Sequence, residues 1–390
     1  MSRGPLTLAA LASAAVPDLD PVSVEGVVTG PDAGYDVAFV HDAEHRRWVI
    51  RCPRDAAAAA ELEQSAVLLT QLARRLTIPV PFVRGWVRLP EGGRAAVHAH
   101  LPGYLLDPAG LTPGRGLAAH LGRALAMLHN LDPRVYEDAG MPVFDAEGYR
   151  ARRLADLDRA AVTGRVPSRL LSRWEQLLED VRHWRFITTP THGALDGSHI
   201  LVVDHEESLA VRGFLGWERA QVADPADDFA FLIGSASEEA METIMEAYAH
   251  TRTEHPDRYV LERARMVAEM ARVRTMMAAV AAGDLDRAAH HEAALRDLDA
   301  ELAGEDPTGA SADRVTAIPI HHSDPADTTE STDGTLYSAS SDDWSTEEYE
   351  VASEALAPED TDTRPIEADR DDDGGDADEH DEPPHSSPSA

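Results

Sequence analysis

Apolar residues follow two different patterns along this chain, and the change between them near residue 100 limits the folds that it can adopt. The first hundred residues contain five short segments rich in β-branched and apolar side chains, at residues 22–28, 35–40, 47–52, 82–89 and 94–99. Turn residues separate several of these segments, as is typical of antiparallel strands. Helical patterns at residues 7–15 and 53–76 accompany them. The sequence therefore predicts a small antiparallel sheet with helices around it.

Beyond residue 100 the spacing of apolar residues is mainly helical. Residues 116–131 place Leu117, Leu121, Leu125 and Leu128 on one side of a helix. Similar patterns predict helices at residues 148–159, 168–184, 237–251, 256–282 and 285–303, with short strands at residues 200–203 and 210–215. We therefore predict an α+β protein with a β-rich N-terminal lobe at residues 1–100 and a mainly helical C-terminal lobe at residues 101–303.

Residues 304–390 have a different composition from the rest of the chain. They contain 26 of the 70 acidic residues but only three of the 35 basic ones, and they lack apolar periodicity. Such a segment cannot bury enough apolar surface to offset the entropy of ordering it, so we predict a disordered acidic tail. Tyr337, Trp344 and Tyr349 leave two interpretations open. The tail either contains a motif that folds on a protein partner or is a solubilising segment with incidental aromatic residues.

The formal net charge of -35 and the single cysteine restrict the partners and the compartment. A strongly negative chain is repelled by nucleic acid and by anionic membrane surfaces, so neither is expected as a partner. Cys52 cannot form an internal disulfide, which fits a reducing, cytoplasmic location. The apolar run at residues 6–16 has weak features of an export signal, but Gly4-Pro5 and a single preceding charge favour a first helix.

Two stretches in the second half of the chain carry the strongest functional signal. Residues 191–203 read THGALDGSHILVV, and residues 213–230 read GFLGWERAQVADPADDFA. Together with residues 34–37 (GYDV), 48–51 (WVIR) and 125–129 (LAMLH), they resemble, in the same order, the aminoglycoside and macrolide phosphotransferase family over residues 22–302. The resemblance implies a two-lobed protein-kinase-like fold and transfer of a phosphoryl group from ATP to a small molecule.

Three positions depart from the pattern of that family. Ala194 stands where the family has its catalytic aspartate, His199 where it has a metal-binding asparagine, and Gly216 where an acid of the metal loop precedes the tryptophan. Phosphoryl transfer depends on a carboxylate that orients the acceptor and on oxygen ligands for Mg²⁺. Alanine and glycine offer no ligand, and a histidine nitrogen suits Mg²⁺ poorly. Binding of Mg²⁺ by the family mechanism is therefore doubtful.

The resemblance still implies a nucleotide site. Arg51 is the expected phosphate-binding base, with Arg54 as the alternative, because arginine binds phosphate well. His192 and His199 are the other predicted cofactor-binding residues, and His192 is also expected to brace the loop from the core. The predicted cofactor is ATP.

The helix at residues 61–72 should supply the carboxylate partner of that base. Alignment of the leucines places Ser65 at the expected position, and Glu61 and Glu63 lie within about a turn of it. The identity of the partner stays open at this point.

Three functional hypotheses follow. The leading one is a family member that has lost metal-dependent catalysis, a pseudokinase that acts in binding or regulation. The second is an active small-molecule phosphotransferase with relocated acids, in which Asp196 is the base and Glu218 approaches the metal. The third is an interaction protein that works through its acidic tail. The acceptor molecule is not predicted, because the helical lobe shows no diagnostic pattern.

Each relocated acid also has a purely structural interpretation. Asp196 stands beside Gly197 and is typical of a turn, and Glu218 is typical of a solvated loop. Asp224 and Asp228 are expected to start helices, since aspartate near a helix N-terminus accepts hydrogen bonds from free N–H groups.

Overall fold

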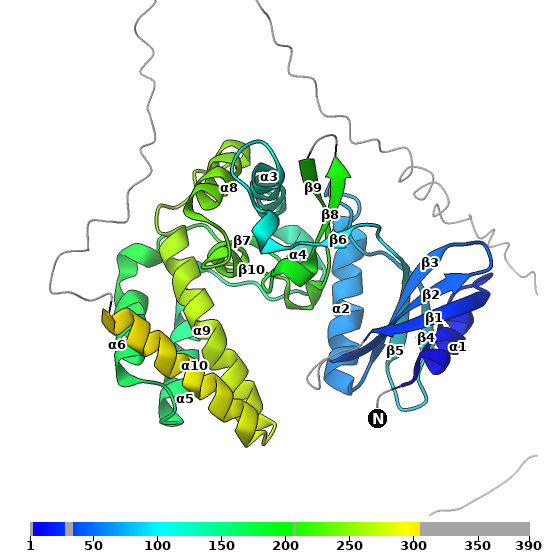
Figure 1. Ribbon diagram of the computed structural model, residues 1–390, viewed down its shortest axis with the longest axis horizontal. Coiled ribbons are helices and arrows are strands. Elements are labelled where there is room, and N and C mark those ends of the chain that lie inside the picture. The colour runs from blue at the N-terminus through cyan, green and yellow to red at the C-terminus, as the bar shows by residue number, and fades with distance from the viewer. Residues whose placement is uncertain (1–2, 28–33, 206–207, 305–390) are drawn as a thin grey trace, which may run out of the picture. The chain divides into compact units, whose positions relative to one another are not determined.

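A five-stranded antiparallel sheet forms the N-terminal lobe in the computed structural model, which describes residues 3–27, 34–205 and 208–304 (Figure 1). Its strand order is β1-β2-β3-β5-β4. The strands are β1 Pro21–Val27, β2 Tyr35–Asp42, β3 Arg47–Pro53, β4 Val83–Arg88 and β5 Arg94–Ala99. The five predicted strands are therefore confirmed, each to within two residues at either end. The predicted acidic tail lies outside the described residues from position 305 onward.

Helices α1, Pro5–Ala15, and α2, Ala56–Leu72, cover the two faces of this sheet. Leu8 and Ala12 of α1 pack with Ala38, Val40 and Ile50 in one buried cluster. Side chains alternate between the two faces of a strand, so Arg51 and Ile50 lie on opposite faces of the sheet. Ile50 faces α1, and Arg51 faces α2. Asp55 begins α2 by accepting a hydrogen bond from the Ala58 N–H at 2.8 Å.

The C-terminal lobe is mainly helical, as predicted. Its helices are α3 Leu117–His129, α4 Arg134–Asp138, α5 Ala146–Val162, α6 Ser168–Glu179, α7 Ala226–Phe229, α8 Glu238–Thr251, α9 Val260–Ala281 and α10 Leu285–Gly304. Three predicted helices are clearly longer than the observed ones. Residues 53–76 shorten to α2 and residues 256–282 to α9, and the helix expected at residues 168–184 ends at Glu179. Asp180 then accepts a hydrogen bond from the Arg182 N–H and starts a separate 3₁₀ turn at Val181–Trp184.

Two small sheets hold the functional loops in place. Strands β6 Tyr104–Leu105, β8 Ile200–His205 and β9 Ser208–Phe214 form one sheet, and β7 Thr189–Thr191 pairs with β10 Gln221–Ala223 in the other. The segment at residues 192–199 therefore connects β7 to β8, and the segment at residues 215–220 connects β9 to β10. The predicted strands at residues 200–203 and 210–215 are confirmed, whereas β6, β7 and β10 are too short to show a pattern.

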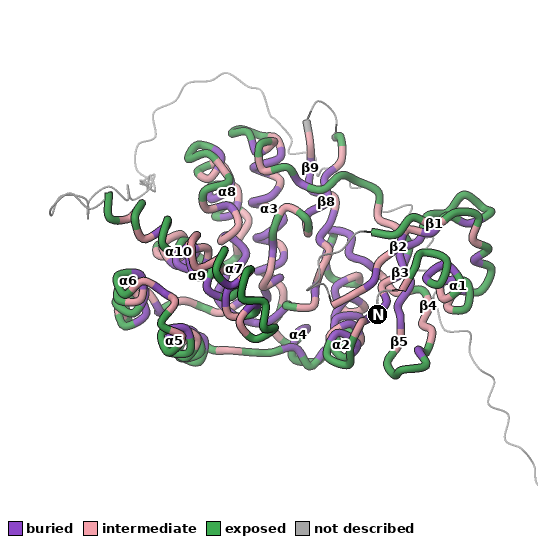
Figure 2. Tube along the Cα trace, turned by 60° about the horizontal axis from the view of Figure 1, so that its bottom comes forward, coloured by how far each residue is buried: buried purple, intermediate pink, exposed green. Residues whose placement is uncertain are grey.

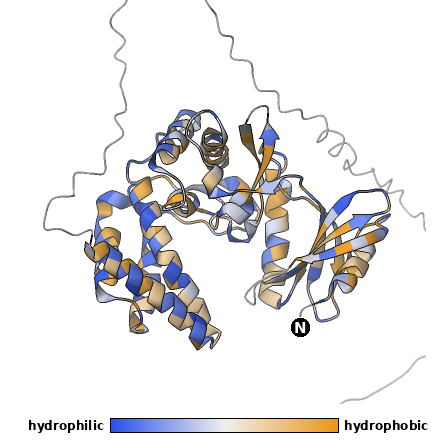
Figure 3. Cartoon of the chain, viewed as in Figure 1, coloured by the Kyte–Doolittle hydropathy of each residue, from blue (hydrophilic) through white to orange (hydrophobic). Residues whose placement is uncertain are grey.

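The largest buried cluster joins the two lobes. It contains Leu68, Leu69 and Leu72 of α2 together with Leu121 and Leu125 of α3. In Figure 2 the buried segments run along β8 and α3, whereas α5 and α6 also show exposed stretches. Hydrophilic and hydrophobic bands alternate along α9 and α10 in Figure 3, as expected for helices with one buried side. No helix within the described ranges is long and apolar enough to cross a membrane.

Candidate functional site

Asp228 of α7 fixes the backbone at the start of the loop between β7 and β8. Its Oδ2 accepts a hydrogen bond from the His192 N–H at 2.8 Å, and its Oδ1 accepts one from the Gly193 N–H at 2.8 Å. The side chain is fully buried. Burial by itself would raise the pKa of Asp228, but the hydrogen bond from His129 and nearby positive charge outweigh it and lower the pKa. Asp228 does lie in the first turn of α7 and is structural, as expected, but its oxygens accept hydrogen bonds from the loop and not from the N–H groups of its own helix.

His129 at the end of α3 connects Asp228 to α8. Its Nε2 donates to Asp228 Oδ2 at 3.0 Å, and its Nδ1 pairs with the Tyr248 hydroxyl at 2.8 Å. The imidazole also packs edge-on against Phe229 and Tyr248. The loop backbone is therefore held by a buried chain of contacts that reaches from α7 through α3 to α8.

The His192 side chain belongs to the core. Its Nε2 donates to the Leu215 carbonyl oxygen at 2.6 Å, and its ring lies 4.9 Å from the Trp217 ring and 5.3 Å from the His199 ring. Burial lowers its pKa, which favours the neutral form. Because this side chain has no exposed surface, the geometry does not support the prediction that it contacts a cofactor.

Ala194 follows directly and presents only a methyl group where the family pattern has a carboxylate. Asp196, the candidate replacement, is engaged in its own turn. Its Oδ1 accepts hydrogen bonds from the Ser198 N–H at 2.8 Å and the Ser198 hydroxyl at 2.6 Å, and it lies 3.2 Å from His199 Nδ1. The side chain is 53% exposed. Asp196 therefore caps the 3₁₀ turn Gly197–His199, which agrees with its structural interpretation.

His199 and Gly216 lie directly against each other. A Cβ on Gly216 would be 2.6 Å from His199 Nε2 and closer still to His199 Cδ2. Gly216 also has a φ of +75°, a left-handed conformation that favours glycine. The imidazole thus fills the space that an acidic side chain at position 216 would need. The two departures from the family pattern are physically linked.

The residues at the metal position do not fit Mg²⁺. Ala194 and Gly216 supply no donor atom, and His199 supplies nitrogen where this cation requires oxygen. Glu218, the remaining candidate, has its carboxylate bound by Arg51. Among residues 3–27, 34–205 and 208–304, no group of three or more His, Cys, Asp or Glu side chains is arranged to hold a metal ion.

Arg51 of β3 forms an ion pair with Glu218 of the segment between β9 and β10. The guanidinium also lies 4.2 Å from the centre of the Tyr35 ring. Both charged side chains are largely buried, with 21% and 12% of their surfaces exposed. Burial would raise the pKa of Glu218, but the charge and hydrogen bond of Arg51 outweigh it and lower the pKa. The expected phosphate-binding base is therefore already occupied by a carboxylate of the same chain.

These contacts answer the open question about the partner of the base. Ser65 of α2 is buried and donates its hydroxyl to the Leu62 carbonyl oxygen, and Glu63 pairs with Arg94 at 3.0 Å. Arg54 pairs with Asp36 at 2.8 Å. Helix α2 does not supply the partner of Arg51, which comes instead from the second lobe. Glu218 is thus not the solvated acid that its position in a loop suggested.

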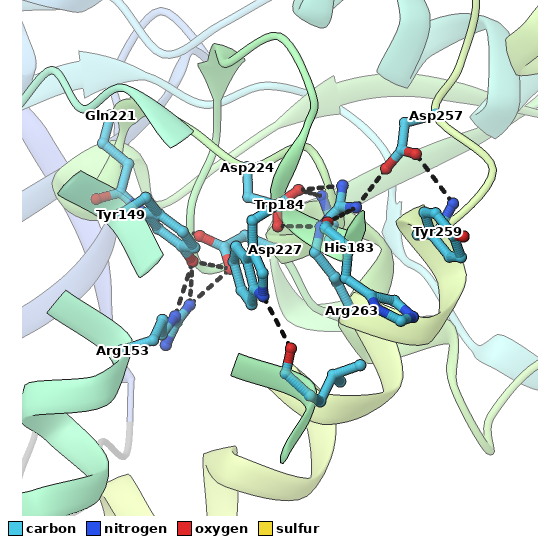
Figure 4. A network of polar contacts seen from close by, with 12 residues as sticks. Tyr149, Arg153, His183, Trp184, Gln221, Asp224, Asp227, Asp257, Tyr259 and Arg263 are labelled. Atoms are coloured by element: carbon cyan, nitrogen blue, oxygen red, sulfur yellow. Dashed lines mark hydrogen bonds and ion pairs between the residues drawn. The ribbon is translucent and has the colours of Figure 1, made fainter. Parts of the chain in front are cut away.

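A second polar network includes Gln221 of β10 and residues of the C-terminal helices (Figure 4). Arg263 of α9 donates to Asp224 through Nε at 2.7 Å and through a terminal nitrogen at 3.0 Å, and both side chains are fully buried. The Asp224 Oδ1 also accepts the Ala226 N–H at 3.0 Å, which agrees with the expectation that it starts α7. Arg153 of α5 pairs with Asp227 at 2.7 Å. This network joins α5, α7 and α9 beneath β10.

Comparison with known proteins identifies the same architecture. A model of the phosphotransferase enzyme family matches residues 27–261. The uncharacterized protein YcbJ of Bacillus subtilis (strain 168) is 26% identical over 227 residues, which are 56% of this chain and 72% of that protein. The chain is also similar to the apoenzyme of macrolide 2'-phosphotransferase MphH from Brachybacterium faecium, with 26% identity and a TM-score of 0.64. That match covers 74% of this chain and 97% of the other.

A more distant structure supports the fold alone. The GDP and kanamycin complex of APH(2")-IIia is 18% identical, with a TM-score of 0.64 over 76% of this chain and 99% of that one. The predicted kinase-like fold and the predicted resemblance are both confirmed by these matches. Because the family model spans more than half of the sequence, this chain belongs to the phosphotransferase enzyme family.

Proposed function

We propose that this chain is a family member that has lost metal-dependent phosphoryl transfer and acts by binding a nucleotide or another small molecule without Mg²⁺. The observation that supports this most strongly is the contact between His199 and Gly216. The family pattern has a metal-binding asparagine at position 199 and an acid at position 216. Here the His199 imidazole stands in place of the asparagine and fills the space that an acid at position 216 would need. Ala194 lacks the carboxylate that would orient an acceptor hydroxyl. Chemistry by the family mechanism has no base and no metal ligands here.

The binding role rests on the frame that is kept. Asp228 holds the loop backbone, and Arg51 stands on the strand that resembles the phosphate-binding strand of the family. One fold neighbour, APH(2")-IIia, forms a complex with GDP and kanamycin. We therefore propose that nucleotide phosphates reach Arg51 by displacing Glu218. Arginine suits this role because its planar donors match phosphate oxygens.

The alternative is an active enzyme that uses Asp196 and Glu218. Asp196 already accepts two hydrogen bonds within its turn, and Glu218 already pairs with Arg51. Both would have to leave their present partners before they could serve a reaction. These contacts favour the binding hypothesis.

Calorimetry with ATP and with GDP, each with and without Mg²⁺, tests the proposal on the full chain. We expect binding whose affinity changes less than about twofold on addition of Mg²⁺ and no turnover in a coupled ADP-release assay. The variant Arg51→Ala should weaken binding about tenfold, since it removes a charge-assisted contact. Turnover that requires Mg²⁺ and disappears in Asp196→Ala would establish the active-enzyme alternative. Absence of any nucleotide binding at millimolar concentration would overturn the nucleotide part of the proposal.

A further inference from the structure

Arg152 of α5 lies beside the loop that contains Ala194. One of its terminal nitrogens donates to Gln221 Oε1 at 3.2 Å, and its guanidinium lies 5.0 Å from the centre of the Phe144 ring. Gln221 in turn lies against the loop, because its Cγ is 3.5 Å from the position that a Cβ on Gly193 would occupy. The Arg152 guanidinium is thus held two contacts away from the start of the loop.

The charge of Arg152 is not balanced by a nearby acid. Its neighbour Arg153 binds the buried Asp227, which also accepts hydrogen bonds from Tyr149 and Gln221. Arg152 itself is exposed and forms no ion pair within the part of the chain that the structure describes. Arg219, which precedes Gln221 by two positions, is also exposed and has no ion pair among these residues.

The acids nearest in sequence are engaged elsewhere. Asp156, one turn further along α5, pairs with Arg159. Asp196 caps its own turn and faces His199. Ala194 removes the carboxylate that the family pattern would place at this point. Arg152 is therefore an exposed cation without an ion pair among the described residues.

The chemistry around Arg152 suits an anion. A guanidinium has five N–H donors in a planar fork, and Gln221 uses one of them while Phe144 supports one face. The remaining donors can bind two oxygens of a carboxylate or phosphate at once. Val143, which is 44% exposed and pairs with Val222 of β10, adds an apolar flank. A ligand that combines an anionic group with a small apolar part matches both features.

We propose that the surface formed by Arg152, Gln221, Phe144 and Val143 binds a small anionic molecule through the Arg152 guanidinium. The proposal rests on the proposed function, in which the loop binds without catalysing transfer. It also predicts which molecules are rejected. A polycation such as kanamycin, which is bound in one fold neighbour, would be repelled by Arg152 and Arg219.

Phenyl phosphate is a suitable probe, since it joins a phosphate group to an aromatic ring. We would titrate it calorimetrically into the full chain and into Arg152→Ala, Arg152→Lys, Arg51→Ala and the control Arg272→Ala. Arg272 is an exposed arginine of α9, so its variant loses the same charge away from the loop. We expect Arg152→Ala to weaken binding about tenfold or more, and Arg152→Lys to weaken it less. The control Arg272→Ala should change the affinity by less than about twofold, and Arg51→Ala should weaken binding less than Arg152→Ala does.

Two outcomes would overturn the inference. The first is absence of binding, or binding that Arg51→Ala abolishes and Arg152→Ala leaves unchanged, because the anion would then occupy the nucleotide side. The second is kanamycin binding more tightly than phenyl phosphate. Neither outcome depends on turnover or on Mg²⁺, so failure here is distinguishable from failure of the proposed function.

Discussion

Two groups of residues near the loop between β7 and β8 differ sharply. One group, the residues behind the loop, consists of the buried acids Asp224 and Asp228. The other, the residues in front of it, consists of Ala194, Gly216 and Glu218. Behind the loop, Asp224 and Asp228 are fully buried and bind an arginine, a histidine or backbone N–H groups. In front of it, Ala194 and Gly216 carry no polar side chain, and Glu218 binds Arg51 of the same molecule. Asp228 holds the loop backbone and Asp224 holds α9 through Arg263, whereas positions 194 and 216 are those where the family pattern has its catalytic and metal-loop acids. The contacts that hold the loop backbone therefore do not depend on the side chains at positions 194 and 216.

The largest expected effect concerns the ion pair behind the loop. Arg263→Ala should lower the free energy of unfolding by about 3–5 kcal/mol, because it leaves the buried Asp224 charge without its partner. Urea denaturation measures this difference. The matched control is Arg265→Ala, an exposed arginine two residues along the same helix, which should stay within about 0.5 kcal/mol of the parent. Equal effects of the two variants would contradict a structural role for the buried pair.

Replacing Asp228 tests the brace of the loop. In Asp228→Asn, an NH₂ group replaces one of the two carboxylate oxygens, so the N–H group of His192 or of Gly193 loses its acceptor. We therefore expect the free energy of unfolding to fall by about 2–3 kcal/mol. Amide hydrogen exchange at these two residues should become faster. The control Asp138→Asn, at an exposed position in α4, should leave both measurements unchanged.

The same variant predicts a change in pH dependence. The pKa of Asp228 is lowered in the folded state from its ordinary value of 3.8. Its contribution to stability is therefore present above pH 3.8 and is lost as the pH falls through the lower folded pKa. Urea denaturation between about pH 5 and 3 should show a steeper loss in the parent than in Asp228→Asn. Parallel curves would show that Asp228 does not titrate in this way.

In front of the loop, the contact between His199 and Gly216 predicts coupled substitutions. Gly216→Asp should cost about 2 kcal/mol, because its Cβ collides with the imidazole and its backbone is left-handed. Combining it with His199→Asn should recover at least about 1 kcal/mol, which a double-mutant cycle measures by thermal or urea unfolding. Strictly additive effects would mean that the two positions do not constrain each other.

The smallest expected effect is on the ion pair in the cleft. Glu218→Gln keeps the shape of the side chain but frees the positive charge of Arg51, so metal-free ATP should bind a few-fold more tightly. The free energy of unfolding should fall by only about 1 kcal/mol, since the glutamine amide oxygen can still accept a hydrogen bond from the largely buried Arg51. Glu175→Gln, at an exposed position in α6, is the control and should leave the affinity unchanged. Weaker binding in Glu218→Gln would show that this carboxylate helps the nucleotide instead of competing with it.

Local patterns in the sequence were sufficient to predict the sheet and the long helices. They could not reveal α4, α7, β7 or β10, because elements of three to five residues show no clear periodicity. The contacts in the site were also hidden, since they join distant positions. Asp228 lies far along the chain from His192, and Glu218 is even further from Arg51. The missing groups at Ala194, His199 and Gly216 were visible in the sequence, but the steric link between two of them was not.

That steric link also means that the order of substitutions at positions 199 and 216 matters. A chain that first changed Gly216 to aspartate would suffer the collision with His199 before it gained a metal ligand. Changing His199 first opens the space without such a penalty. Changing His199 first therefore avoids the collision, although an aspartate at position 216 still carries the strain of a left-handed backbone in either order.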